Sequence, residues 1–196
     1  MTIPAGRKTS NIRRSIQVRI GDEVSTDTTG ARGQTTSVTA QIHHGDPWAD
    51  PEAVGDPSQV PADQWLTTTW VEDGAGRRGS SLLQIDVYSL IKGRGDLDGD
   101  PHGMIADDLA DAVEALFVGR EDDGLGAERA LIPVSDYIVP TSPVATTETA
   151  LCITSSGSRG TPQDRRRVRA GAHWRITLRF RFRLIRDLYD NDAALT

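Results

Sequence analysis

The sequence predicts an α+β fold, in which an antiparallel or mixed β-sheet carries one or two helices on one face and long loops project from it. Three observations predict this fold: a closing run that alternates apolar and basic residues, one clear amphipathic helix, and short β-rich runs between Gly/Pro-rich segments. With 196 residues the chain is long enough for one compact core. We therefore expect a single domain over residues 1–196, with long loops at 43–63 and 155–171.

The N-terminal segment, residues 9–20, fits two kinds of secondary structure. Ile12, Ile16 and Ile20 have helical spacing, whereas residues 16, 18 and 20 also alternate as in a strand. A helix is favoured by Gly21 as a stop and by three polar residues available as caps, namely Thr9, Ser10 and Asn11. We expect a short helix here.

The next part of the chain has the pattern of three strands. Residues 38–42 alternate as a strand, and the proline- and aspartate-rich residues 43–63 then predict a long surface loop. Strand character returns at residues 64–71 and 81–90, on either side of a glycine-rich turn. The last two strands are expected to form a hairpin.

A helix is expected to follow, with Asp100 as N-cap, Pro101 in its first position and Gly119 at its end. Its apolar stripe consists of Ile105, Leu109, Ala112, Val113, Leu116 and Phe117. Its solvent side consists of acidic residues, namely Asp107, Asp108, Asp111 and Glu114.

The C-terminal third is expected to contain further strands. Residues 131–139 form one that Pro133 interrupts, which suits an edge or a bulge, and residues 149–154 form a shorter one. The polar connection 155–171 then leads into the closing strand, residues 174–184. These last two strands are expected to form a hairpin with a projecting tip.

The closing strand has one apolar face and one basic face. The apolar face consists of Trp174, Ile176, Leu178, Phe180, Phe182 and Leu184, and the other face of Arg175, Thr177, Arg179, Arg181 and Arg183. The arginines fit a solvated face, a protein interface or, less well because the phenylalanines lie on the apolar face, a nucleic-acid surface. As candidate interface residues we take Arg175, Arg179, Arg181 and Arg183 together with the acidic Asp107, Asp108, Asp111 and Glu114.

Charge is distributed unevenly along the chain. The net charge of -6 argues against nonspecific nucleic-acid binding by the whole surface. Residues 165–186 nevertheless hold nine arginines and no carboxylate, whereas residues 46–73 and 107–123 are strongly acidic. Such segregation suits subunits that interlock.

Catalytic, metal and membrane signals are weak. The aspartates at 96, 98 and 100 resemble a calcium loop, but Pro101 occupies the position that needs glycine. Cys152 is the single cysteine, and no nucleophile elbow or phosphate-binding loop is present in the sequence. No secretion signal or membrane-length apolar stretch is visible. We expect a protein of the reducing cytosol without enzymatic activity, cofactor, metal or membrane association.

Residues 79–118 resemble the middle of the tail terminator proteins of long-tailed bacteriophages and related prophage elements. The resemblance lies in the strand at 82–88, the loop after it and the helix at 105–117, and the closing strand at 173–184 resembles the last strand of that family. It implies a structural virion protein that forms a homohexameric ring on the tail tube. Such a ring ends tube polymerisation and provides the surface for attachment of the head.

The resemblance also implies where the protein acts and with what partners. The subunit would be assembled in the host cytoplasm and would sit at the head-proximal end of the virion tail. Its partners would be further copies of itself, the major tail tube protein and the head-completion proteins of the neck, and the ring would enclose DNA without sequence-specific binding. The alternative function is that of a head-completion or connector protein of the neck. Two hypotheses from other classes are a small hydrolase or metal-dependent enzyme and a binding module encoded by the host.

Overall fold

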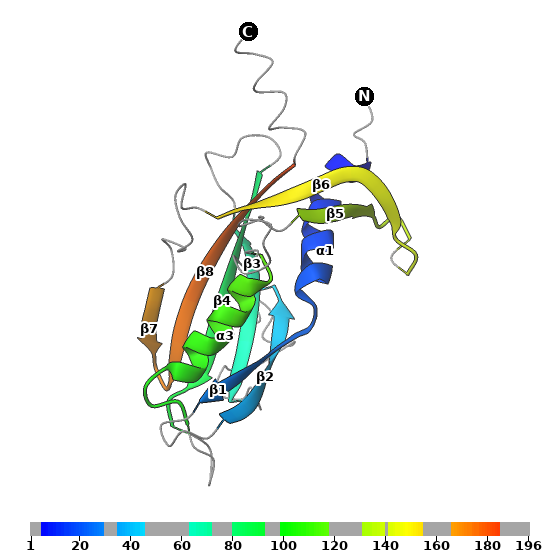
Figure 1. Cartoon of the computed structure of the whole chain (residues 1–196). Coiled ribbons are helices and arrows are strands. Elements are labelled where there is room, and N and C mark those ends of the chain that lie inside the picture. The colour runs from blue at the N-terminus through cyan, green and yellow to red at the C-terminus, as the bar shows by residue number, and fades with distance from the viewer. Residues whose placement is uncertain are drawn as a thin grey trace, which may run out of the picture.

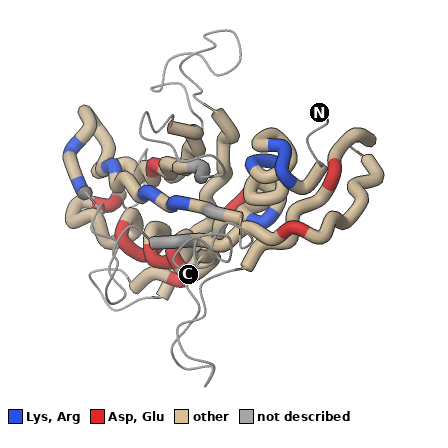
Figure 2. Tube along the Cα trace, turned by 90° about the horizontal axis from the view of Figure 1, so that it is seen from above, with Lys and Arg blue, Asp and Glu red and all other residues tan. Residues whose placement is uncertain are grey.

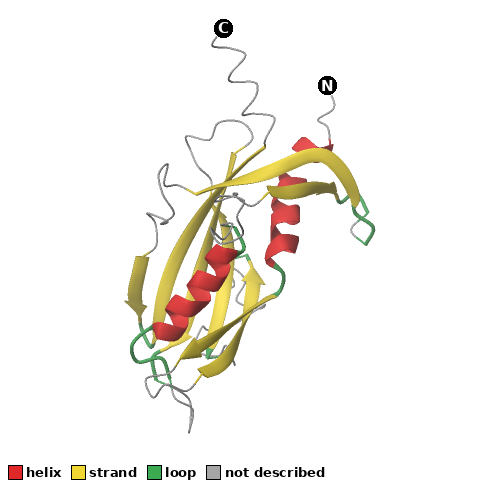
Figure 3. Cartoon of the chain, in the orientation of Figure 1, coloured by secondary structure: helices red, strands yellow, loops and turns green. Residues whose placement is uncertain are grey.

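The computed structural model describes residues 5–29, 35–45, 63–71, 80–92, 99–117, 131–139, 141–154 and 166–184. As predicted, the fold is mixed α+β: a curled, mostly antiparallel sheet of eight strands forms a half-barrel with two α-helices (Figure 1 and Figure 3). The described elements are, in chain order, η1 (Ala5–Arg7), α1 (Thr9–Ile20), β1 (Glu23–Thr29), β2 (Thr35–His44), β3 (Gln64–Val71), β4 (Ser80–Leu90), α3 (Met104–Ala115), β5 (Leu131–Asp136), β6 (Val144–Thr154), β7 (Arg166–Ala170) and β8 (His173–Leu184).

The sheet has the order β1-β2-β3-β4-β8-β6-β5, and β7 pairs with β8 beside this path. Among these pairs β2 and β3 run parallel, and the others are antiparallel. The hairpin expected from the two central strands is present as β3 and β4. The closing strand β8 is an interior strand of the sheet, because β4 pairs with it on one side and β6 and β7 pair with it on the other.

The core lies between the sheet and α3, which crosses the inner face of the curled sheet (Figure 1). Leu109 and Val113 of α3 are fully buried, and the Phe117 ring lies 4.6 Å from the Phe180 ring, centroid to centroid. Phe180 belongs to the apolar face of β8, which is buried from Ile176 onward as its alternation predicts. Helix α3 therefore packs on the apolar face of β8, and the arginines face the other side.

Helix α1 has the predicted bounds but not the predicted caps. Ile12, Ile16 and Ile20 are buried, and Gly21 ends the helix with a positive φ of 80°. The residue before the helix, Lys8, makes no side-chain cap. The Asn11 amide instead donates to the Ala5 carbonyl at 2.9 Å and to Asp136 Oδ1 of β5 at 3.0 Å.

Helix α3 begins later than predicted. Its first residue is Met104, after Gly103 in the left-handed conformation at φ 74°. Asp100 is buried and accepts a hydrogen bond from the backbone N–H of Ala106 at 3.0 Å. Asp100 thus stabilises the first turn from outside the helix, since Gly103 turns the chain back toward it. The helix also ends earlier than predicted, at Ala115: Leu116 and Phe117 form a turn in which the Phe117 N–H donates to the Glu114 carbonyl at 3.0 Å. Gly119 itself, the expected stop, lies outside the described residues.

The strands also correct the sequence prediction. Two strands, β1 and β7, were not predicted, and β7 occupies part of the segment expected to be a loop at 155–171. The strand expected at 131–139 ends at Asp136, whereas β6 begins at Val144, before the expected 149. Pro133 does lie on an edge strand beside a register shift, as predicted. The loop predicted at 43–63 begins two residues late, because His43 and His44 belong to β2, and residues 46–62 and 155–165 lie outside the described part.

Candidate subunit interface

The basic face of β8 lies on the outer side of the sheet, beside side chains of β4. Register pairs Arg175 with Tyr88 and Arg179 with Gln84. Arg179 is exposed and Arg181 is partly buried. Arg183 belongs to β8, but its side chain lies outside the described part of the structure. The outer face is therefore a mixed polar surface, in which the arginines have neighbours from another strand.

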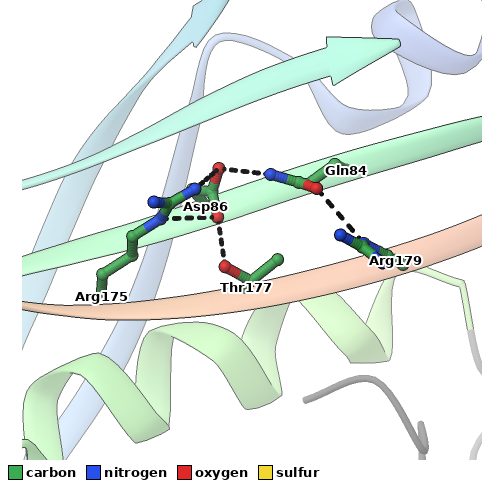
Figure 4. A network of polar contacts seen from close by, with 5 residues as sticks. All are labelled: Gln84, Asp86, Arg175, Thr177 and Arg179. Atoms are coloured by element: carbon green, nitrogen blue, oxygen red, sulfur yellow. Dashed lines mark hydrogen bonds and ion pairs between the residues drawn. The ribbon is translucent and has the colours of Figure 1, made fainter. Parts of the chain in front are cut away.

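The centre of this surface is Asp86, whose side chain is only 7% exposed. Arg175 donates from Nε to Oδ1 at 3.0 Å and from Nη2 to Oδ2 at 2.9 Å (Figure 4). Thr177 donates to Oδ1 at 2.5 Å and Gln84 to Oδ2 at 2.9 Å. A buried carboxylate needs such partners, because its charge has lost the solvation of water. Asp86 thus fixes the position of Arg175 within the subunit.

The charge on Arg175 is stabilised by this contact. The hydrogen bond to Asp86 raises the pKa of the Arg175 guanidinium, and the negative charge of Asp86 adds to the effect, while partial burial opposes it. Arg175 also lies over the ring of Tyr88 at 5.9 Å, and that ring stacks on Trp65 at 4.9 Å. This arginine is therefore a structural residue of the outer face.

The second half of the predicted interface is the solvent side of α3. Asp111 is exposed, and Asp107, Asp108 and Glu114 are partly exposed. Asp107 forms an ion pair with Arg167 of β7 at 2.8 Å within the same subunit. The first helical turn favours carboxylates through the helix dipole, which explains Asp107 and Asp108 in part.

The structure does not bring the predicted basic and acidic residues of the interface together within one subunit. Arg175 and Arg179 contact Asp86 and Gln84 on the outer face of the sheet. Helix α3 packs on the opposite, apolar face, and Figure 2 shows its acidic positions in red. The arginines of β8 and the carboxylates of α3 therefore face opposite sides of the sheet, although Arg167 of β7 reaches Asp107 of α3. A contact between them requires two copies of the chain.

Two features of the site were missed at the sequence level. One is the pairing of Asp86 with Arg175, since the register between strands so far apart in the chain has no local signal. The other is α1, whose Arg13, Arg14 and Arg19 make it a basic helix without any carboxylate. The second feature was visible as a charge pattern in the sequence.

Chemical sites other than an interface find no support among the described residues. No three His, Cys, Asp or Glu side chains cluster there in a way that suits a metal ion. Cys152 is fully buried in the core, and His44 contacts the Thr68 hydroxyl at 3.0 Å. Of the aspartates that resemble a calcium loop, Asp100 is used in the turn before α3, and the other two lie outside the described part. None of the described helices is long and apolar enough to cross a membrane.

Comparison with known proteins does not assign this chain to a family. No protein-family model matches the chain, and a search of curated proteins finds no match.

Proposed function

We propose that this chain is the tail terminator of a long-tailed bacteriophage or of a related prophage element. In this proposal copies of the chain, assembled in the host cytoplasm, form a homohexameric ring at the head-proximal end of the virion tail. The ring ends polymerisation of the tail tube protein and then offers its free side to the head-completion proteins of the neck, with DNA passing through its lumen. The protein acts by assembly and has no enzymatic role.

The observation that carries the proposal is the arrangement of the segments that resemble the family. These segments are β4 and α3, which belong to the one stretch 79–118, and β8, which lies far from them in the sequence. In the structure β4 and β8 are paired strands, and α3 packs on both. The resemblance therefore falls on one continuous structural unit, which supports a common fold better than scattered matches would.

The charge distribution supports self-assembly of the chain through a contact between two different surfaces of neighbouring subunits. Arg167 of β7 pairs with Asp107 of α3, but the basic face of β8 lies on the side of the sheet opposite α3, and the basic helix α1 lies apart from α3 (Figure 2). A contact between different surfaces of identical subunits is heterologous, and it closes into a ring when the rotation per subunit allows. Electrostatic complementarity gives such a contact its register.

A capping experiment tests this function. Purified chain added to growing tubes of the cognate tail tube protein is expected to stop elongation and to appear at one end of each tube in electron micrographs. Lys92 is exposed and is not one of the side chains of the basic face of β8, so the Lys92→Glu variant is the control and should cap normally. Tubes that grow at the same rate with and without the chain would count against the proposal.

The basic face of β8 has its own test. If Arg179 and Arg181 make the ring contact, the double variant Arg179→Glu plus Arg181→Glu should form no rings. Normal rings from this variant would exclude the outer face of β8 as the basic half of the contact, while leaving the capping function intact.

A further inference from the structure

The turn between β5 and β6 presents an unusual amount of apolar surface. We call β5, β6 and the described residues that join them the arm, which projects beyond the body of the domain (Figure 1). Six large apolar side chains are exposed in the described part of the chain, and three lie at this turn: Ile138, 76% exposed, Val139, 53%, and Val144, 66%. Scattered exposed apolar residues are ordinary, but a group at one tip is typical of an interaction surface.

The arm is held in place by α1. The Asn11 amide donates to Asp136 Oδ1 at 3.0 Å, and Ser15 Oγ accepts the backbone N–H of Ser135 at 3.0 Å. Arg14 lies over the ring of Tyr137 at 5.2 Å. Because α1 accepts an N–H group of β5, this edge of the sheet is partly blocked against another strand. The tip is thus fixed before any partner binds, which lowers the entropy cost of docking.

The segment before α1 fixes the other strand of the arm. Arg7 forms an ion pair with Glu148 of β6 at 3.2 Å. A Cβ at Gly6 would lie 2.5 Å from Glu148 Cγ and 2.7 Å from Thr146 Oγ1, so the backbone of η1 lies directly on β6. The segment before α1 therefore contacts β6 through the Arg7 side chain and through its own backbone.

The exposed side of α1 continues the surface of the arm and adds positive charge. Arg14 and Arg19 are exposed, Val18 is 65% exposed, and the helix contains no carboxylate. Arg14 and Val18 lie one turn apart on the same helix face. The combined surface is apolar at the tip and basic along the helix.

The solvent side of α3 has a composition complementary to that of the arm and α1, since it carries acidic residues and one exposed apolar residue. Met104 is 43% exposed, Asp111 is exposed and Asp108 is partly exposed, and the helix contains no lysine or arginine. Residues 104, 108, 111 and 115 follow one stripe of an α-helix. Both α1 and α3 have 12 residues, and each is therefore about 18 Å long.

We propose that α1 and the arm of one copy dock on the solvent side of α3 of a second copy. Ile138, Val139 and Val144 would cover Met104 and its neighbours, while Arg14 and Arg19 would face Asp108 and Asp111. The two surfaces differ, so each copy offers one of each and the contact repeats head to tail around a ring. The inference rests on the proposed ring and names α1, in place of the outer face of β8, as its basic half.

Mixing two variants tests this contact. The arm variant is Ile138→Asp plus Val139→Asp, and the helix variant is Asp108→Arg plus Asp111→Arg. Each changes exposed or partly exposed side chains, and circular dichroism confirms that each one folds. Analytical ultracentrifugation should show that wild-type chain forms oligomers, and that each variant alone stays monomeric because its dissociation constant rises at least ~30-fold, as for loss of a central interface contact.

The mixture is the decisive sample. The arm variant still has an intact α3, and the helix variant still has an intact arm, so together they form one good contact and should give a one-to-one dimer that does not grow. Oligomers from either variant alone, a monomeric mixture, or wild-type chain that stays monomeric at its highest attainable concentration would each overturn the inference.

The outcome is separable from that of the proposed function. The variant Arg179→Glu plus Arg181→Glu should oligomerise like wild-type chain, and loss of its oligomers would move the contact to β8. Tube capping without the arm contact would overturn only this inference. A dimer in the mixture without any capping of tubes would overturn only the proposed function.

Discussion

Replacing Arg175 with alanine should destabilise the subunit far more than the same replacement at Arg179. Both arginines belong to the basic face of β8, but Arg175 makes two hydrogen bonds to the buried carboxylate of Asp86, whereas Arg179 makes one bond of 3.2 Å to the neutral Gln84. Arg179→Ala is therefore a matched control on the same strand.

The structure sets the size of the effect. Removing one partner from a buried ion pair costs about 3–5 kcal/mol. The Arg175 side chain is 36% exposed, and the hydroxyl of Thr177 and the amide of Gln84 still bond to Asp86, so we expect a smaller loss, about 2–3 kcal/mol. The exposed Arg179 should contribute within about 0.5 kcal/mol.

Urea unfolding followed by far-ultraviolet circular dichroism measures both values. The unfolding free energy should fall by about 2.5 kcal/mol per molar urea. Arg175→Ala should then lower the urea concentration at the unfolding midpoint by about 1 M, and Arg179→Ala by about 0.2 M or less. In an Asp86→Asn background, Arg175→Ala should cost less, because no buried charge remains to be compensated. Equal losses from the two alanine variants would refute the argument.

The sign of the pKa shift also fixes the pH dependence of this difference. The pKa of Arg175 is raised in the folded state, chiefly by the hydrogen bond to Asp86. The stabilisation from this group is then fully present below the unfolded pKa and is lost only as the pH rises through the folded one. The gap between wild-type chain and Arg175→Ala should therefore stay constant from neutral to mildly alkaline pH.

Three further substitutions have expected results. Gly6→Ala should destabilise the chain by about 1–3 kcal/mol in thermal unfolding, because its Cβ would overlap Glu148, whereas an effect near zero would mean that η1 moves freely. Leu109→Ala should cost about 2–5 kcal/mol in urea, since this side chain of α3 is fully buried in the core between the helix and the sheet, and a loss below about 1 kcal/mol would contradict that packing. Trp174→Phe should cost about 1 kcal/mol, as it removes the indole hydrogen bond of 2.8 Å to the carbonyl of Asp100, and amide exchange of the first turn of α3 should accelerate with it.

The sequence predicted the elements whose side chains divide cleanly between core and solvent. The closing strand β8 was visible because its period of two separates phenylalanines from arginines, and α1 was visible through isoleucines four residues apart. The start of α3 was misplaced because Pro101 suits a first helical position, while the structure places Gly103 in a left-handed turn and lets Asp100 reach Ala106 from outside the helix.

The missed strands have almost no apolar signal. Strand β1 buries only Val24 and Thr28, and β7 has the sequence RRVRA with the side chain of Val168 partly exposed. Such strands form because a neighbouring strand supplies hydrogen bonds, and this is a tertiary effect. The same reason hides the pair of Asp86 and Arg175, which depends on the register of two distant strands. The acidic side of α3 was predictable, because its carboxylates recur at helical spacing in the sequence.

The most direct test of the proposed terminator is electron microscopy of particles assembled without this chain. If the chain is the terminator, these particles should have overlong tails without heads, because nothing stops polymerisation of the tube and no surface remains for the neck. Tails of normal length beside detached filled heads would indicate a connector instead, and intact virions would contradict any role in joining head and tail.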